Sequence, residues 1–102
     1  FLPMTNSHSS HLAVLSVQFH IPASQSLKEK RCVVKSIKDK VRSRFNVSVA
    51  EIGGLDKWQD CVLGIAMIGS DKKYVDSGLQ NVLSLIEKVH DIRVLRHEFS
   101  FL

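Results

Sequence analysis

Five basic side chains recur in the first half of the chain at a spacing suited to binding polyanions. They are Lys28, Arg31, Lys35, Lys38 and Arg42, at positions i, i+3, i+7, i+10 and i+14. On a helix these positions lie within about 80° of arc and form a row about 21 Å long, which we call the basic ridge. Such a row can follow the phosphates of an RNA groove, because each neutralised phosphate releases condensed counterions.

The positive charge of the chain is concentrated around this ridge. Residues 28–44 hold eight basic and two acidic residues, a net charge of +6, against +4 for the whole chain, so the other residues sum to −2. An excess confined to one element gives the molecule a directional field that attracts polyanions. A solvated helix face is the alternative interpretation of the same residues.

The remaining titratable residues do not form a catalytic or metal-binding pattern. His20, His90 and His97 fall on three different predicted elements without an H-x-x-x-H or H-E-x-x-H spacing, and Gly53-Gly54 is a turn rather than a phosphate-binding loop. We therefore predict no catalytic residue, no metal ligand, no cofactor and no small-molecule substrate. The protein is predicted not to be an enzyme.

The two cysteines and two carboxylates near the middle of the chain do not change this interpretation. Cys32 and Cys61 lack a C-x-x-C spacing, and Cys61 reads as a small buried hydrophobe, whereas Cys32 falls on the exposed flank of a helix with no base assignable to it. Glu51 and Asp56 could form an acidic pair, although a solvated loop explains them as well.

Two further residues are candidates for single contacts with a partner. Trp58, the one tryptophan, follows the glycine turn and reads as a lid over the core or as an interface anchor. His20 lies on the polar side of the first predicted strand with Ser16 and Gln18. That side carries no aromatic residues, so base stacking of the kind seen in RNA-recognition motifs is disfavoured.

The periodicity of the chain places these residues on six elements. Residues 1–11 are polar and aperiodic and are predicted to be a tail or an added segment outside a single domain of residues 12–102. Residues 12–21 alternate apolar and polar side chains, which predicts a strand. The sequence Ser26-Leu27-Lys28-Glu29 is a capping box, in which the Ser26 hydroxyl accepts the Glu29 amide and the Glu29 carboxylate returns to the Ser26 amide. The helix that follows ends near Arg44. Its core-facing stripe is Leu27, Val33, Val34, Ile37, Val41 and Phe45.

The second half of the chain repeats the pattern. We predict strands over residues 46–52 and 60–68, a helix from Ser70-Asp71 to His90, and a weaker edge strand over residues 92–99. The order β-α-β-β-α-β is that of the ferredoxin-like split βαβ fold, an α+β fold with a four-stranded antiparallel sheet and two helices on one face. The first and third strands lie in the middle. The other sheet face is solvated or covered by a partner, which makes a homodimer the competing hypothesis.

Several strings resemble those of a bacterial family of small proteins, the YlxP-like family, which is classed as a domain of unknown function. The strings run from residue 19 to residue 59 and are Phe19-His20-Ile21-Pro22, Ser26-Leu27-Lys28-Glu29-Lys30-Arg31, Val33-Val34-Lys35-Ser36, Arg44-Phe45-Asn46-Val47-Ser48-Val49-Ala50-Glu51 and Asp56-Lys57-Trp58-Gln59. The resemblance extends from about residue 12 to the end and implies a ferredoxin-like fold. It also implies a gene neighbourhood of translation initiation and ribosome maturation, and no established activity.

Length and composition limit the class of protein. With 102 residues, 44% hydrophobic and 24% charged, the chain has room for one packed domain. It has no apolar run of the roughly 18–20 residues that a membrane span requires, so we predict a cytoplasmic protein without a membrane partner. The leading hypothesis is a non-enzymatic accessory protein that binds RNA or the ribosome through the basic ridge. The alternative is a homodimeric structural or regulatory module without a nucleic-acid role.

Overall fold

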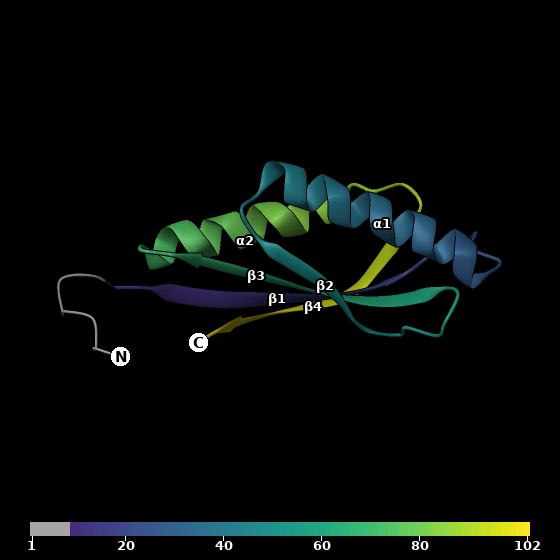
Figure 1. The fold of residues 1–102 in the computed structure, drawn as a ribbon, viewed down its shortest axis with the longest axis horizontal. Coiled ribbons are helices and arrows are strands. Elements are labelled where there is room, and N and C mark those ends of the chain that lie inside the picture. Colours follow the sequence, from purple (N-terminus) through teal and green to yellow (C-terminus); the bar gives the residue numbers. More distant parts are fainter. Residues whose placement is uncertain (1–8) are drawn as a thin grey trace, which may run out of the picture.

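A four-stranded antiparallel sheet with two helices over one face forms the protein in the computed structural model, which describes residues 9–102 (Figure 1). The elements are β1 (His11–His20), α1 (Leu27–Arg44), β2 (Ser48–Gly53), β3 (Asp60–Gly69), α2 (Lys72–Glu87) and β4 (Arg93–Phe101). The strand order is β2-β3-β1-β4. The predicted ferredoxin-like arrangement is therefore confirmed, with the first and third strands in the middle.

The element boundaries differ from the predicted ones by a few residues at most. β1 begins at His11, α2 ends at Glu87 rather than at His90, and β4 continues to Phe101. The tail predicted for residues 1–11 falls largely on residues 1–8, which lie outside the described residues. The Ser9 hydroxyl lies 3.4 Å from the Ser70 carbonyl, to which it donates.

Alternation along the two central strands builds the core. β1 and β3 pair over ten residues each, from His11 opposite Gly69 to His20 opposite Asp60. The side chains at every second position of both strands face the helices and are buried. They are Ala13, Leu15, Val17 and Phe19 from β1 and Cys61, Leu63, Ile65 and Met67 from β3. This period of two explains why the strands could be placed from their sequence.

The helix α1 begins where its capping sequence predicts. The Glu29 amide donates to the Ser26 hydroxyl at 3.1 Å, as expected for an N-cap. The return contact differs from the prediction, because the Glu29 carboxylate accepts from the Gln25 amide at 2.8 Å rather than from the Ser26 amide. The carboxylate thus accepts a hydrogen bond from the backbone amide of the residue that precedes the N-cap.

The helix α2 packs an apolar stripe onto the two central strands. Its N-cap is Asp71, whose carboxylate accepts from the Lys73 amide at 3.1 Å. Its buried residues are Val75, Leu79, Val82, Leu83 and Ile86. Val89, which lies beyond the end of the helix, is partly buried and packs against the same core.

The two helices leave the opposite face of the sheet uncovered. In Figure 1 both helices lie above the sheet and no element of residues 9–102 lies below it. We call the uncovered side the open face. From the described strands it displays the side chains that alternate with the core positions, including Val14, Ser16 and Gln18 of β1 and Val62, Ala66 and Ile68 of β3.

Candidate functional site

The basic ridge forms on the outer flank of α1. Four of its five side chains belong to exposed residues, and Lys38 is half-buried. Val33 lines a hollow together with Asp91, which follows α2, and Lys28 at the start of the ridge lines the same hollow. The other four ridge residues lie on the opposite flank of α1, so from Arg31 onward the ridge projects away from α2 and from the open face of the sheet.

One carboxylate lies inside the ridge. The Asp39 carboxylate lies 2.8 Å from Lys35 Nζ and 3.6 Å from an Arg42 guanidinium nitrogen. The hydrogen bond from Lys35, followed by the positive charges around it, lowers the pKa of Asp39 below its ordinary value of 3.8. Lys28 and Arg31 form no ion pair among residues 9–102. The first turns of α1 therefore offer the freest positive charges to a ligand.

A sixth basic residue of the same helix is buried beneath the ridge. Lys30 is 1% exposed, and its Nζ lies 2.7 Å from Glu51 Oε2 of β2. The same ammonium donates to the Gly54 carbonyl in the β2–β3 connection, where Gly54 adopts a φ of +72° that favours glycine. Glu51 Oε2 has no hydrogen-bond partner, so the Lys30 contact is a close ion pair that lacks hydrogen-bond alignment. Lys30 thus joins α1 to β2 and its loop.

The thiol of Cys61 lies beside this ion pair and is fully buried. Desolvation, followed by the negative charge of Glu51, raises the pKa of Cys61 from its ordinary value of 9.0 to about 12. Cys61 is therefore a neutral core residue at physiological pH, as its sequence context predicted, and Cys32 is exposed, also as predicted. A high thiol pKa disfavours the nucleophilic thiolate.

The sequence reasoning missed the buried pair of Lys30 and Glu51. It placed Glu51 with Asp56 as an acidic pair or in a solvated loop, but Glu51 lies within β2 opposite Leu63 and pairs with Lys30. A helical wheel contained the missing signal. At 100° per residue counted from Lys28, Lys30 lies at about 200°, within the sector of about 180–240° that Val34, Ile37 and Val41 occupy. A buried charge at such a position requires a partner.

The predicted stripe of α1 was partly wrong at its ends. Val34, Ile37 and Val41 are buried as predicted, whereas Val33 and Phe45 only pack against the margin of the core. Leu27 is half-buried in the first turn. Lys30 occupies the core position at this end of the helix, and its aliphatic stem supplies the apolar contact there.

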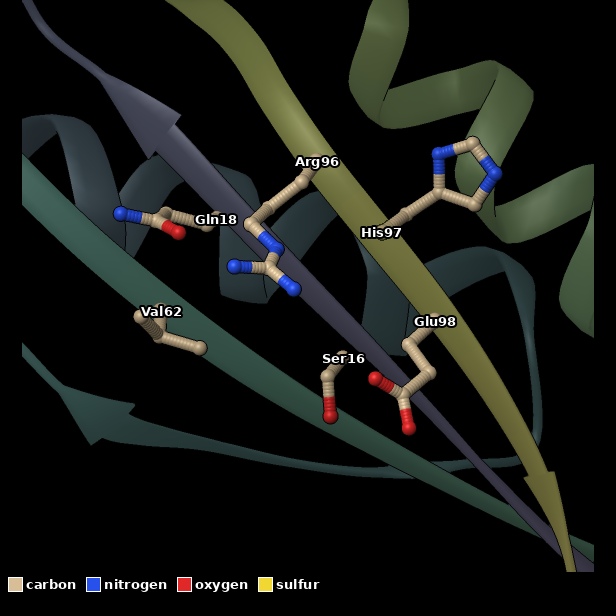
Figure 2. Close-up of a pocket in the computed structure, with 6 residues that line it drawn as sticks. All are labelled: Ser16, Gln18, Val62, Arg96, His97 and Glu98. Carbon is tan, nitrogen blue, oxygen red and sulfur yellow. The ribbon is translucent and has the colours of Figure 1, made fainter.

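The open face carries a polar lane along β1 and β4. A shallow hollow of about 130 Å³ is lined by Ser16, Gln18, Val62, Arg96, His97 and Glu98, whose side chains are drawn in Figure 2. Arg96 pairs in register with Gln18, and Glu98 with Ser16. In the figure the Arg96 and Glu98 side chains lean over β1, whereas His97 points away from them. This lane was also missed, although alternate charges on a predicted edge strand indicate a shared face.

The two predicted contact residues lie away from the basic ridge. His20 ends β1, on the open face, and its Nδ1 lies 3.1 Å from Asp60 Oδ1. Trp58 is 55% exposed in the β2–β3 connection, so it is not a lid over the core. The structure does not gather His20, Trp58 and the ridge into one site. His20 and Trp58 both lie beside Asp60, which His20 contacts and which lines a hollow with Trp58.

The described residues contain no constellation that resembles an active site. No group of three His, Cys, Asp or Glu side chains in residues 9–102 is placed to hold a metal ion. The largest hollow described, about 580 Å³, lies at the start of α1, where Cys32 and Lys28 meet Glu29 of the capping box and Asp91. No histidine lines it. Among the described helices, none is long and apolar enough to cross a membrane.

The geometry defines a small α+β protein of the ferredoxin-like class with a basic helix flank and an uncovered sheet face. A model of the family described as protein of unknown function (DUF503) matches residues 12–99, so the chain belongs to this family. The chain is also similar to the uncharacterized protein YlxP of Bacillus subtilis (strain 168). The two are 45% identical over 67 residues, which cover 66% of this chain and 73% of that protein. The resemblance noted from the sequence is confirmed.

A solved structure supports the fold independently of sequence. The de novo designed protein Foldit4 matches with a TM-score of 0.52 and 16% identity, over 87% of this chain and 96% of that one. At such low identity the similarity concerns the arrangement of helices and strands alone.

Proposed function

We propose that this protein is a non-enzymatic RNA-binding accessory protein that contacts RNA phosphates, free or within the ribosome, through the basic ridge of α1. One observation carries the proposal. Five basic side chains lie along one exposed flank of a single helix with one acidic residue, Asp39, among them. The rest of the chain has a net negative charge, so this flank is where a polyanion is attracted.

The shape of the flank suits a phosphate backbone. A straight row about 21 Å long, on a helix capped at its start and packed along its inner side, presents its charges at fixed intervals without a large ordering cost. Lys28 and Arg31 are free of ion pairs among the described residues, so they can bind phosphates without first breaking a contact.

The ridge lacks the amide and aromatic side chains that hydrogen-bond to or stack on exposed RNA bases. It contains lysines and arginines, with Ser36 and Ser43 on the neighbouring exposed side of the helix. Binding through such a surface is governed by phosphate contacts, which position a protein on RNA but carry little sequence information. We therefore expect modest sequence specificity and a strong dependence on salt.

The proposal is tested by measuring RNA binding against salt concentration with fluorescence anisotropy. The test variant replaces three ridge residues by glutamine, namely Lys28, Arg31 and Lys35. Removing charge, rather than reversing it, avoids a repulsion between position 35 and Asp39. We expect the slope of log K against log salt to fall by about 2–3, because three phosphate contacts are lost.

A matched control removes the same charge elsewhere. It replaces Lys57, Lys73 and Lys88, which lie in exposed positions outside α1, by glutamine. Circular dichroism establishes that both variants fold, and co-sedimentation with ribosomes repeats the comparison on a natural RNA assembly. Selective loss in the ridge variant supports the proposal. Equal, flat curves for wild type and both variants would refute it and favour a protein module without a nucleic-acid role.

A further inference from the structure

The open face exposes large apolar side chains beside its polar lane. Ile52 and Ile68 are 55% and 60% exposed, and Leu12, the register partner of Ile68, is 38% exposed. Ile52 lies over Gly64 at the centre of β3, where a Cβ would come within 3.1 Å of it. Contiguous exposed apolar side chains on a sheet face are typical of an interface.

Two opposite charges stand side by side on the same face. Arg96 and Glu98 of β4 are two residues apart, lie opposite Gln18 and Ser16, and are both exposed. Neither has an ion-pair partner within 4.0 Å among residues 9–102. Their positions along the strand differ by about 6.7 Å, so each is free to meet a charge brought from above the face.

We propose that the open face binds a second copy of this chain, with the two sheets packed face to face about a twofold axis. The axis lies between the two sheets, perpendicular to the strands, and passes midway between the levels of Ser16 and Gln18. Each strand therefore lies over the same strand of the other copy and runs antiparallel to it. Arg96 of one copy meets Glu98 of the other, and the contact occurs twice because the interface is symmetric. The Gln18 amide likewise meets the Ser16 hydroxyl, and Val62 packs over Gly64.

The charges of the face favour a second copy over RNA. Besides Arg96 and Glu98, the open face holds Arg93 opposite His20, and Asp60, which contacts His20. Two basic and two acidic residues cancel, so the face has little attraction for a polyanion, in contrast with the ridge on the helix layer. Arg96 and Glu98, two residues apart on β4, are self-complementary under the proposed axis.

The part of the face that overlaps in such a dimer suits a weak, reversible association. About this axis residues 14–20 of β1 and the residues beside them face one another, which gives about 19 by 23 Å, or about 440 Å² from each copy. The total of about 900 Å² is in the range of weak, transient interfaces. Face-to-face packing leaves the helices on the outer sides of the dimer, so both basic ridges remain accessible. The dimer proposal does not depend on the proposed function.

Exchanging the charges of Arg96 and Glu98 tests the interface, because only residues in contact across it should lose and then regain dimerisation. Sedimentation equilibrium of the full chain over a range of concentrations measures the mass and the dissociation constant. We expect a mass of twice 11.5 kDa for the wild type. Arg96→Glu places like charges together at two symmetric contacts and weakens dimerisation by at least about tenfold. The double variant Arg96→Glu with Glu98→Arg restores both contacts and returns the constant to within about threefold.

The control is Lys73→Glu, an equal charge reversal on exposed α2, which should leave the dissociation constant unchanged. Circular dichroism and thermal melts confirm that each variant folds. A mass of 11.5 kDa at every concentration up to about 1 mM would overturn the proposal. So would a dimer that Arg96→Glu leaves intact, or a folded double variant that dimerises no better than the single one.

Discussion

Lys30 and Lys35 lie five residues apart on α1 and occupy opposite environments. Lys30 is 1% exposed and paired with Glu51, whereas the Lys35 side chain is 77% exposed and paired with Asp39 on its own helix. Both pairs are close, at 2.7 and 2.8 Å. Burial, rather than distance, distinguishes them, because water screens the outer pair and not the inner one.

This difference divides the basic residues of one helix into two roles. The ammonium of Lys30 also bonds to the Gly54 carbonyl, so it connects the helix to a strand and a loop that are distant in sequence. Lys35 and Arg42 of the ridge pair only with Asp39 of their own helix, within the described residues. Charge in the same segment therefore serves packing on one side and, under the proposed function, recognition on the other.

The largest effect is expected from removing the buried ammonium. Lys30→Met should destabilise the protein by about 3–5 kcal/mol, because the Glu51 carboxylate is left largely buried without its counter-charge. That is a large part of the about 5–15 kcal/mol that stabilises a domain. Urea denaturation measures the change. The matched control Lys35→Met should change the stability by at most about 0.5 kcal/mol.

A double variant separates the cost of leaving Glu51 without a counter-charge from the cost of losing the Lys30 side chain itself. Lys30→Met with Glu51→Leu removes both charges and should recover much of the lost stability, because an apolar pair of similar size replaces a desolvated ion pair. A Lys30→Met protein as stable as the wild type would contradict the structural role given to this ion pair.

The next effect concerns the thiol beside the ion pair. The folded-state pKa of Cys61, about 12, is raised above its ordinary value of 9.0, so the protonated thiol is favoured by folding. This contribution is fully present below pH 9 and is lost as the pH rises from about 9 to 12. At pH 10 the loss is on the order of 1 kcal/mol.

Denaturation of wild type and Cys61→Ala at pH 7 to 11 checks this pH dependence. The variant is expected to be less stable at pH 7, because it leaves a small cavity in the core. The test is the difference in slope, since lysines titrate equally in both proteins. The stability of the wild type should fall more steeply above pH 9. Parallel curves would show that Cys61 is not held neutral by folding.

The fold was largely predictable from periodicity and capping. Alternation along β1, the nearly continuous apolar run of β3 and the Ser26 cap each act locally, so neighbouring residues are enough to reveal them. The order of elements then restricted the topology to few choices, because short right-handed connections place both helices on one face. The ends of α2 and β4 were less well predicted, since helix fraying and edge pairing depend on contacts across the fold.

The interactions between elements were the part that local patterns could not supply. Lys30 and Glu51 are 21 positions apart, and whether they pair depends on how α1 lies over β2. Arg96 and Glu98 share a face because they lie two residues apart on β4, but the register shift at Leu95, the extra residue of β4 between the partners of Gln18 and Phe19, decides that this is the open face. A bulge of this kind carries no clear sequence signal.

The smallest expected effect comes from the carboxylate inside the ridge. Asp39 neutralises Lys35 and Arg42, so Asp39→Asn should release both for phosphate contacts and raise RNA affinity by about two- to fivefold at low salt. Stability should change little, because exposed pairs contribute at most about 1 kcal/mol. Anisotropy titrations compare this variant with Glu87→Gln, which removes one negative charge from an exposed position on α2. Equal affinity gains in the two variants would mean that net charge, not position on the ridge, governs binding. A gain confined to Asp39→Asn would show that the outer pairs of α1 limit how many ridge charges reach the RNA.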